Sequence, residues 1–535
     1  MSVNERLVYL GPEKFPSLES QKDKVRDIPV CIIIPPSTFL ADERVFPFLG
    51  ALKIAAELER NGNPIKVLDL SGHQNYLDII DQYVSQNGRH VFGITATTPQ
   101  IPATMQIAER IKTISPESHI ILGGPHATLT HTAMKEDIKF GAPRRGTRAF
   151  EQLTKYVDKI VVGDGEAAIF YAIDPDYLDN IVDAGNNKSP LFLAKGTLDQ
   201  YAWPARHLID HESYKYYITD QGQRYRTFSV ISQLGCPFGC GFCGGRKSQV
   251  FRMARQREIG NTIDEIRQVI IGSKNWAEPL RGVMFYDDEL NINPGTLENL
   301  CLGLIKMQKE LGIEMRFRGF IKAELFTSEQ AELMYKAGFR VVLSGVESGS
   351  DQMLRAMNKG TSRETNARCV NLAHQAGLRF KALMSIGHPG ESSQTVEESI
   401  DWVVNNLKHG DEIDWTIITQ YPGTPYYDES IFIPEKKAWV YTIADPHTHQ
   451  PLRLWSDELN YAKDTNFYKG IPGDYTAYIW TDHLNPQELV VIRDHAERTT
   501  RKYLQLPEIQ TVAARQFEHS MGQGLPSHIL RSGNS

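Results

Sequence analysis

The 535-residue sequence is poor in cysteine, with six in all, and it has no apolar run of the roughly 20 residues that a membrane helix needs. Secreted disulfide scaffolds are small and much denser in cysteine, so that class is excluded. The opening residues, from Met1 to Arg6, lack the apolar segment of a secretory signal. We therefore predict a cytoplasmic protein that makes no contact with a membrane.

An excess of basic residues is also missing, because 58 Lys and Arg stand against 65 Asp and Glu and give a net charge of −7. Nucleic-acid binding usually needs a basic face, so no nucleic-acid partner is expected. Internal repeats and low-complexity tracts are lacking as well. The length exceeds the roughly 250–300 residues at which a single core stops growing, which predicts more than one domain.

Short apolar runs alternate with helical patterns in the first part of the chain. This alternation predicts an α/β domain with a doubly wound, Rossmann-like parallel sheet. The expected strands are 30–34, 66–70, 91–95, 119–124 and 159–163. The segment 130–156 is rich in Lys and Arg and is expected to be an insertion. Residues 186–190, Asn-Asn-Lys-Ser-Pro, are typical of a linker that ends the domain.

A second alternating series predicts a partial (β/α)6 barrel of the TIM type. Its expected strands are 227–232, 283–287, 314–319, 340–345, 380–386 and 415–420. The alternation ends near residue 426, and the aromatic and polar residues that follow are interpreted as an α-rich C-terminal cap. The predicted domains are therefore 1–190, 191–425 and 426–535.

Half of the six cysteines fall within eight residues, in Gly-Cys-Pro-Phe-Gly-Cys-Gly-Phe-Cys. Cys236, Cys240 and Cys243 have the spacing C-x3-C-x2-C and follow the first barrel strand, at the end where barrel enzymes hold their catalytic residues. A [4Fe–4S] cluster normally takes four thiolates, so three leave one iron open to another ligand. A structural zinc site is the alternative, but it needs four Cys or His ligands in paired spacings, and no second pair stands nearby.

This loop and the motifs after it resemble the radical S-adenosylmethionine (SAM) superfamily over residues 225–425. The resemblance implies that Cys236, Cys240 and Cys243 hold the cluster and that SAM chelates the open iron. An electron passed through the cluster then breaks a C–S bond and yields a 5′-deoxyadenosyl radical. The further cofactor-binding residues that it implies are Phe242, Tyr286, Asp287, Asp288, Glu347, Ser348, Arg255 and Arg257.

Each of these motifs also has a purely structural interpretation. The alternatives are a helix cap for Asp287 and Asp288, a buried ion pair with Lys359 for Glu347, and a solvated face for Arg255 and Arg257. Lys322 stands where many members of the superfamily carry an arginine. A lysine cannot make the bidentate carboxylate contact that an arginine makes, so that contact is not expected here.

Small and polar residues end the expected N-terminal strands, where doubly wound sheets bind their ligands. None of these loops has the G-x-G-x-x-G pattern of a dinucleotide site. Over residues 28–170 the pattern resembles the cobalamin-binding domain of one radical SAM subgroup. The resemblance implies cobalamin contacts from Pro36, Ser37, Ser71, Gly72, Thr97, Thr98, Gly123, Gly124, His126, Gly163, Gly165 and Glu166. The alternative is a sheet that serves only as a scaffold.

The two resemblances together predict a cobalamin-dependent radical SAM enzyme, similar to the class B methylases. It is expected to methylate an unactivated carbon of a small-molecule or natural-product substrate, with flavodoxin or ferredoxin as an external electron donor. The alternative is the same architecture performing a non-methylating rearrangement, cyclisation or oxidation. A sensor is disfavoured, because it has no need of an open iron. The D-x-H-x-x-G histidine motif is lacking, so we expect the dimethylbenzimidazole to be displaced and cobalt to have no His ligand.

Overall fold

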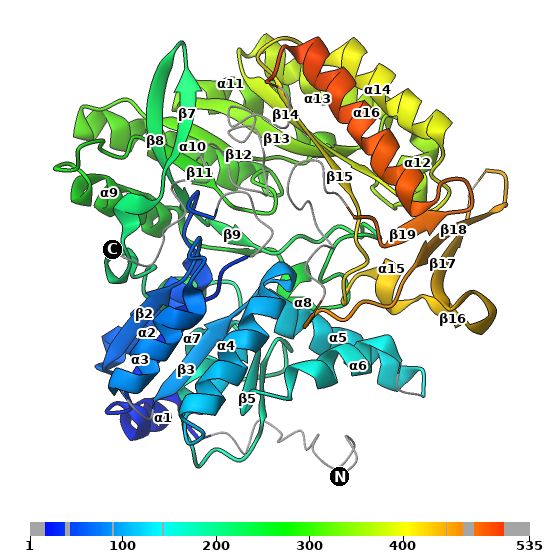
Figure 1. Cartoon of the computed structure of the whole chain (residues 1–535). Coiled ribbons are helices and arrows are strands. Elements are labelled where there is room, and N and C mark those ends of the chain that lie inside the picture. The colour runs from blue at the N-terminus through cyan, green and yellow to red at the C-terminus, as the bar shows by residue number, and fades with distance from the viewer. Residues whose placement is uncertain are drawn as a thin grey trace.

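The structure is a computed structural model that describes residues 16–37, 43–87, 90–141, 144–445, 447–463 and 476–507. It is an α/β molecule in three parts, as Figure 1 shows. The N-terminal sheet and its helices (blue to cyan) lie below a larger curved sheet (green to yellow), and a C-terminal cap (orange to red) lies to one side. Within the described ranges, no helix is both long and apolar enough to cross a membrane.

Six parallel strands form the N-terminal sheet in the order β2-β1-β3-β4-β5-β6. They are β1 (Val30–Ile34), β2 (Ile65–Asp69), β3 (Val91–Thr95), β4 (His119–Gly123), β5 (Lys159–Gly163) and β6 (Ile181–Ala184). The apolar runs predicted the first five. Strand β1 is buried along its whole length, which explains its unbroken apolar run. Strand β6 has only four residues and alternates in burial, so its sequence signal is weak.

Helices cover both faces of this sheet, as a doubly wound fold requires. Ile32 and Ile34 of β1 pack with α1, α2 and α7, whereas Cys31 and Ile33 pack with α3 and α4. The helices are α1 (Leu18–Val25), α2 (Leu49–Asn61), α3 (Tyr76–Asn87), α4 (Ile101–Ile114), α5 (Pro125–Lys139), α6 (Arg145–Leu153) and α7 (Gly165–Ala172). The prediction of an insertion at 130–156 is wrong, because this segment forms most of α5 and all of α6, in the crossover between β4 and β5.

The second sheet has seven strands in the order β15-β14-β13-β12-β11-β8-β7. The six strands from β15 to β8 are parallel and each overlaps a predicted barrel strand, while β7 adds an antiparallel edge. They are β7 (Tyr216–Asp220), β8 (Gln223–Val230), β11 (Gly282–Phe285), β12 (Arg316–Phe320), β13 (Phe339–Glu347), β14 (Arg379–Ile386) and β15 (Glu412–Ile417). A two-stranded ribbon, β9 (Gln233–Leu234) with β10 (Arg255–Gln256), follows β8.

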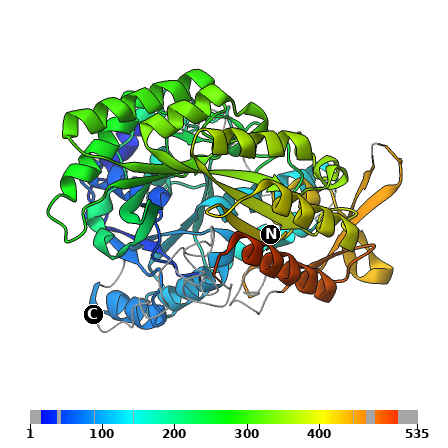
Figure 2. The same cartoon turned by 90° about the horizontal axis from the view of Figure 1, so that it is seen from above.

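The barrel helices lie along one side of the curved sheet, and the blue N-terminal part lies on the other side (Figure 2). They are α9 (Ile259–Gly272), α10 (Pro294–Leu311), α11 (Ser328–Ala337), α12 (Asp351–Ala356), α13 (Arg363–Gln375) and α14 (Ser393–Asn406). The short helix α8 (Gln249–Arg252), between β9 and β10 in the chain, lies apart from this layer, beside the N-terminal part (Figure 1). The apolar faces of the helices in the layer and the outward-facing strand residues share one hydrophobic core, in which Phe285, Phe317 and Phe339 pack together. This core fixes the strands whose carboxyl ends carry the predicted site.

The C-terminal cap combines helix and sheet. Its helices are α15 (Pro425–Asp428) and the long α16 (Pro486–Leu504), which packs against β15. The helix α16 accords with the expected α-rich cap, but the four-stranded antiparallel sheet beside it was not expected from the sequence. Its strands are β16 (Ile431–Ile433), β17 (Ala438–Ala444), β18 (Pro451–Ser456) and β19 (Ile479–Thr481). Each has three to seven residues, too few for a clear alternating pattern.

A buried arginine of α6 joins the N-terminal domain to the cap. The Arg145 guanidinium donates to the Tyr427 carbonyl oxygen at 2.6 Å, to Gln420 Oε1 at 2.9 Å and to Ser456 Oγ at 3.2 Å. It also lies over the Tyr427 ring, 3.7 Å from the ring centroid. Its neighbour Arg148 contacts the cap at the surface, through an ion pair with Glu458 and over the ring of Trp439.

Arg145→Met is therefore expected to lower the free energy of unfolding by about 2–4 kcal/mol, because it leaves several buried acceptors without a donor. Arg148→Met is the matched control. It removes an exposed ion pair and is expected to lower the free energy of unfolding by at most about 1 kcal/mol. Chemical denaturation followed by circular dichroism measures both. Equal losses for the two variants would contradict this role for Arg145.

Candidate active site

The cysteine loop connects β9 to α8, directly beyond the carboxyl end of β8. The Arg246 guanidinium braces it, donating hydrogen bonds to the carbonyl oxygens of Cys236 at 2.7 Å and Phe238 at 2.6 Å. Gly235 has a φ of +82°, and a Cβ there would lie 2.2 Å from the Met253 carbonyl oxygen, so only glycine fits. The loop is thus held to one backbone path at its start.

Two later segments hold the same loop from its other side. The Gly241 N–H donates to the Met357 carbonyl oxygen at 2.9 Å, and the Tyr426 N–H donates to the Gly241 carbonyl oxygen at 3.1 Å. The Gly245 N–H donates to the Gly423 carbonyl oxygen at 3.0 Å. Met357 follows β13 and the two other partners follow β15, so the position of the loop depends on distant barrel strands.

The three thiols of the loop are free of disulfide bonds and lie close enough to affect one another. Burial raises the pKa of Cys243 to about 12; Arg246 lowers it, and the thiols of Cys240 and Cys236 raise it. In the described part of the chain, no three His, Cys, Asp or Glu side chains converge on a single metal ion. Three free thiols on one loop, near enough to alter one another's pKa, fit a cluster held by three thiolates.

Acidic residues follow β11, as the sequence analysis noted. Asp287 is buried and accepts hydrogen bonds from the Ser232 N–H at 2.6 Å and from the Ser232 hydroxyl. It thereby ties the end of β11 to the end of β8, and burial raises its pKa to about 6. Asp288 lines a cavity between the domains. The next helix, α10, is capped by Asn293, so the helix-cap alternative does not hold for either acid.

The third acid of this segment, Glu289, was missed by the sequence analysis. Its Oε2 atom is buried and has no hydrogen-bond partner among the described residues. Burial raises the pKa of Glu289 to about 8, while the charges of Lys359 and Lys322 lower it. Its carbonyl oxygen accepts from Gln233 Nε2 at 3.2 Å, just before the cysteine loop, and its charge raises the pKa of Cys236. The run of three acids after a strand was the signal that could have singled it out.

Glu347 ends β13 in the left-handed backbone region, with a φ of +64°. Its Oε1 lies 3.0 Å from Lys359 Nζ, which is the ion pair named above as the structural alternative, and its Oε2 accepts from the Ser385 hydroxyl at 2.7 Å. Ser348 is buried and its hydroxyl bonds to that of Ser399, at 2.9 Å, so it braces α14. The Glu347 carboxylate is therefore held from two sides.

Arg255 and Arg257 do not lie on a solvated face. Arg255 is buried and forms an ion pair with Asp164 of the N-terminal domain. Arg257 pairs with the buried Glu265, at 2.6 Å, and Arg206 binds the same carboxylate at 2.8 Å. Both predicted arginines are thus occupied in structural ion pairs, and Arg255 joins the two domains.

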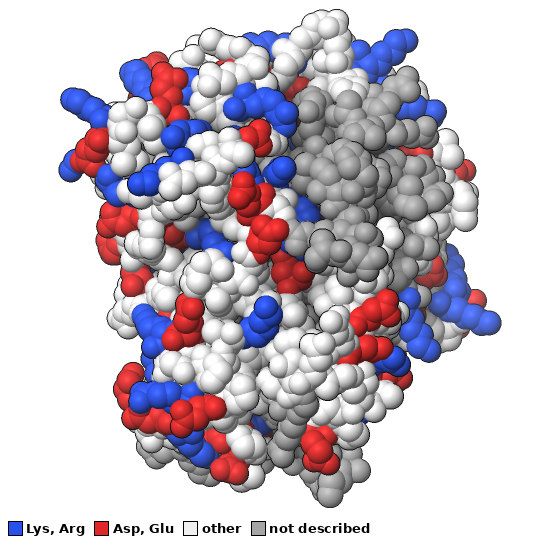
Figure 3. All heavy atoms as spheres, turned by 60° about the vertical axis from the view of Figure 1, so that its left-hand side comes forward, with Lys and Arg blue, Asp and Glu red and all other residues white. Residues whose placement is uncertain are grey.

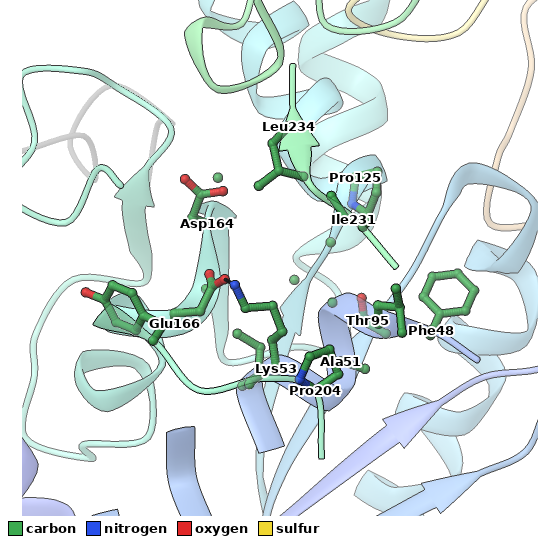
Figure 4. Close-up of a pocket in the computed structure, with 18 of the residues that line it drawn as sticks. Phe48, Ala51, Lys53, Thr95, Pro125, Asp164, Glu166, Pro204, Ile231 and Leu234 are labelled. Atoms are coloured by element: carbon green, nitrogen blue, oxygen red, sulfur yellow. Dashed lines mark ion pairs between the residues drawn. The ribbon is translucent and has the colours of Figure 1, made fainter. Parts of the chain in front are cut away.

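A cavity of about 430 Å³ lies between the N-terminal sheet and the barrel, and is called here the interdomain cavity (Figure 4). The carboxyl ends of β3, β4 and β5 contribute Thr95, Gly123 and Gly163 to its wall. Ile231 and Tyr286, just beyond the ends of β8 and β11, line it from the barrel side. The carboxyl ends of the two parallel sheets therefore open onto one space.

The interdomain cavity has an apolar slot and a charged rim. The slot lies between the sheet and helices α2 and α7, and is lined by Ile32, Ala51, Ile54, Gly93, Ile121, Val161 and Ile169. On the rim, Lys53 and Glu166 point toward each other, 3.1 Å apart, and Asp164 lies nearby (Figure 4). Arg255 pairs with Asp164, so each rim carboxylate has a cation beside it.

The cavity brings together only part of the predicted site. The predicted residues in its wall are Gly123, Gly124, Gly163, Gly165, Glu166, Arg255, Arg257, Tyr286 and Asp288. The remaining predicted cofactor residues are not among the described residues that line it: Pro36, Ser37, Ser71, Gly72, Thr97, Thr98, His126, Phe242, Asp287, Glu347 and Ser348. His126, for example, is buried with its Nδ1 bonded to Thr98 Oγ1 at 2.9 Å and its ring against Tyr461 of the cap.

Two segments match known families. Residues 43–154 match the B12 binding domain, and residues 230–403 match the radical SAM superfamily. The chain joins a B12-binding domain to a radical SAM domain. The two families identify its cofactors as a [4Fe–4S] cluster, SAM and cobalamin, and the protein as a radical SAM enzyme. The domain boundaries 1–190, 191–425 and 426–535 stay predictions, although both matches fall inside the first two ranges.

In curated relatives, about one quarter of the aligned residues are identical to those of the chain. An uncharacterized methyltransferase of Pyrococcus horikoshii is 23% identical, over 75% of this chain and 83% of that protein. An anaerobic magnesium-protoporphyrin IX monomethyl ester cyclase of Rubrivivax gelatinosus is 24% identical, over 66% of this chain and 62% of that protein. A bacteriochlorophyllide d C-12(1)-methyltransferase of Chlorobaculum tepidum is 28% identical, over 45% of this chain and 51% of that protein. The chain thus spans between about half and four fifths of these relatives.

Solved structures share the architecture. The methyltransferase TsrM from Kitasatospora setae, with cobalamin and a [4Fe–4S] cluster bound, superposes with a TM-score of 0.54 at 16% identity, over 79% of this chain and 82% of that one. The cobalamin-dependent enzyme OxsB superposes with a TM-score of 0.52 at 15% identity, over 73% of this chain and 54% of that one. The predicted fold, a Rossmann-like sheet followed by a partial barrel, is confirmed.

Replacing Cys236, Cys240 and Cys243 together with Ala is expected to remove the cluster. Anaerobically purified protein should contain about four irons and four sulfides, and the triple variant should contain neither. The matched controls, whose thiols pack in hydrophobic cores and should be dispensable, are Cys31→Ala, Cys301→Ala and Cys369→Ala. Iron and sulfide analysis measures the cluster content. If the triple variant retains iron and sulfide, the cluster lies elsewhere.

Proposed function

We propose that the protein is a cobalamin-dependent radical SAM methyltransferase that methylates an unactivated carbon of a small-molecule or natural-product substrate. The observation that carries the proposal is the interdomain cavity, onto which the B12-binding and radical SAM domains both open. Methylation of such a carbon requires both cofactors to reach the same substrate atom. When bound, the cluster with SAM supplies the 5′-deoxyadenosyl radical and cobalamin supplies the methyl group.

The lining of the cavity supports cobalamin binding. The apolar slot suits a flat, apolar group such as the dimethylbenzimidazole of the cofactor. The rim pair of Lys53 with Glu166 offers a donor and an acceptor for the amides that surround a corrin.

The residues beside the cysteine loop support SAM binding. Glu289 has a buried carboxylate oxygen without a described partner, and the SAM ammonium group would satisfy it. Asp288 lies in the cavity wall and, like Glu289, affects the pKa of Cys236. Glu347 is already positioned by Lys359 and Ser385, as a carboxylate that binds ribose hydroxyls must be. These three acids would orient SAM against the cluster.

An aromatic pair at the barrel side of the cavity supports a small-molecule substrate. Tyr286 lines the cavity, and its ring meets that of Phe46 at 5.3 Å in an edge-on contact. Similar proteins include the bacteriochlorophyllide methyltransferase and a tryptophan 2-C-methyltransferase of Streptomyces laurentii, which is 25% identical over 39% of this chain. We infer a substrate with a flat or apolar part, and an external flavodoxin or ferredoxin as the electron donor.

A second candidate is a radical reaction on the same architecture without methyl transfer. The observation that favours it is the similarity to the magnesium-protoporphyrin IX monomethyl ester cyclase. The two candidates differ in what becomes of SAM. A methyltransferase converts part of its SAM to S-adenosylhomocysteine and part to 5′-deoxyadenosine, whereas a cyclase has no need to form S-adenosylhomocysteine.

The reconstituted, reduced holoprotein is therefore expected to form both S-adenosylhomocysteine and 5′-deoxyadenosine from SAM. Without cobalamin, the formation of S-adenosylhomocysteine should stop while 5′-deoxyadenosine continues. Mass spectrometry of the two products measures this, and a deuterated SAM methyl group reports transfer to candidate substrates. If 5′-deoxyadenosine forms alone with cobalamin bound, the second candidate holds instead.

Gly123→Val is expected to reduce cobalamin retention at least about tenfold with the fold intact. A Cβ at Gly123 would meet only Val161, at 3.8 Å, so the larger side chain would fill the cavity edge without a clash with the backbone. Gly260→Ala, where a Cβ meets open space in helix α9, is the matched control. Reconstitution with hydroxocobalamin, desalting and absorbance measure retention, and full retention by Gly123→Val would place the cofactor elsewhere.

A further inference from the structure

A chain of hydrogen bonds between side chains runs from Glu347 to the cysteine loop. Glu347 Oε2 accepts from the Ser385 hydroxyl at 2.7 Å. Ser385 Oγ lies 2.8 Å from His388 Nε2, and His388 Nδ1 lies 3.3 Å from the Tyr426 hydroxyl. Ser385, His388 and Tyr426 are buried, and none of them belongs to the predicted cofactor site. We call this chain, Tyr426–His388–Ser385–Glu347, the relay.

The direction of each hydrogen bond in the relay follows from counting hydrogens. Lys359 Nζ lies 3.0 Å from Glu347 Oε1, so Glu347 is a carboxylate and only accepts. The single Ser385 hydroxyl hydrogen goes to Glu347, so Ser385 Oγ must accept from His388 Nε2–H. A neutral imidazole with its hydrogen on Nε2 has an acceptor at Nδ1, which takes the Tyr426 hydroxyl hydrogen. Every donor therefore points toward Glu347.

The far end of the relay touches the cysteine loop at consecutive residues. The Tyr426 N–H donates to the Gly241 carbonyl oxygen at 3.1 Å, and a Cβ at Gly241 would lie 2.5 Å from the Tyr426 ring. The Phe242 ring meets the His388 ring edge-on, with centroids 5.2 Å apart. Gly241 and Phe242 directly precede Cys243, so the relay packs on the backbone that carries this cysteine.

Glu347 needs such support, because its backbone is unfavourable. Its φ of +64° lies in the left-handed region, which residues with a Cβ rarely adopt, and the β13–β14 register shifts between Gly345 and Glu347. The side-chain bonds to Lys359 and Ser385 hold the carboxylate in this conformation. A substitution of Ser385 would therefore change the position of the Glu347 carboxylate.

We propose that His388 and Tyr426 are positioning residues that orient Glu347 and fix it relative to the cysteine loop. This inference rests on the proposed role of Glu347 in binding SAM. Neither His388 nor Tyr426 would touch the cofactor. They would act through Ser385, by allowing only one hydroxyl orientation to reach the carboxylate. SAM affinity would thus depend on a tyrosine that lies three hydrogen bonds away from Glu347.

Variants of His388 test the relay one bond at a time. In His388→Asn the side-chain oxygen can replace Nδ1 as the acceptor for Tyr426 but cannot reach Ser385. In His388→Gln the amide nitrogen can replace Nε2 as the donor to Ser385 but leaves Tyr426 without its acceptor. Each variant is expected to bind SAM about five- to tenfold more weakly, with the iron content unchanged. Calorimetry on the anaerobic, cluster-loaded protein measures the affinity.

Tyr426→Phe is expected to weaken SAM binding to a similar degree, and Tyr441→Phe is its matched control. The Tyr441 ring packs on Tyr426, with centroids 4.8 Å apart, but its hydroxyl is not part of the relay. The double variant Tyr426→Phe, Ser385→Ala should bind SAM no more weakly than Ser385→Ala alone. Two residues that make no direct contact show such non-additivity only when a third residue couples them. The electron paramagnetic resonance spectrum of the reduced cluster with SAM should shift in the same variants.

The outcomes separate this inference from the proposed function. If Glu347→Gln binds SAM normally, the premise about Glu347 fails. If Glu347→Gln weakens binding while the His388 and Tyr426 variants do not, the relay is overturned and the role of Glu347 stands. Fully additive effects of Tyr426→Phe and Ser385→Ala would overturn the relay as well. Neither result depends on cobalamin or on methyl transfer, which are tested separately.

Discussion

The ion pair between Arg255 and Asp164 joins the two domains at the rim of the interdomain cavity, and the arrangement of both candidate cofactor sites depends on it. Arg255 is buried and also donates to the carbonyl oxygens of Leu193, at 2.8 Å, and Val250, at 3.0 Å. Burial raises the pKa of Asp164 to about 6, and the Arg255 charge opposes that rise. A buried charge without its partner is costly, so the pair holds the loop after β5 against the strand that follows the cysteine loop. The two domains therefore face each other in one orientation.

That orientation matters because of the polarity of parallel sheets. The parallel strands of each sheet have their carboxyl ends on the same side, and the loops on that side can carry polar or catalytic groups without interrupting the core. Thr95, Gly123 and Gly163 end strands of one sheet, and Ile231 and Tyr286 follow strands of the other, yet all line one cavity. The charged rim lies between them, at the surface where the domains meet. Two separate binding edges thus become a single reaction space.

The sequence was sufficient for β1 to β5, for the six parallel barrel strands and for the place of the cysteine loop, but not for β6, the cap sheet or the exact wall of the cavity. Apolar runs revealed β1 and β3 because these strands are buried on both faces. The same reasoning placed Ser71 at the cofactor site, but it follows β2, which lies at the edge of the sheet and away from the central strands. His126 was expected at a strand end, but it lies in the first turn of α5 and faces the cap. A sequence shows where a strand ends, whereas strand order and side-chain direction come from tertiary packing.

Packing of the domains and geometry of the cysteine loop are linked through one tyrosine. Arg145 of the N-terminal domain donates to the carbonyl oxygens of Tyr427, at 2.6 Å, and of Tyr426, at 3.3 Å. Tyr426 in turn donates to the Gly241 carbonyl oxygen, and its hydroxyl begins the relay to Glu347. Neighbouring atoms of a close-packed interior move together, so a shift of α6 would displace the loop that holds the cysteines. The helix that the sequence suggested was an insertion is therefore part of the support of the candidate active site.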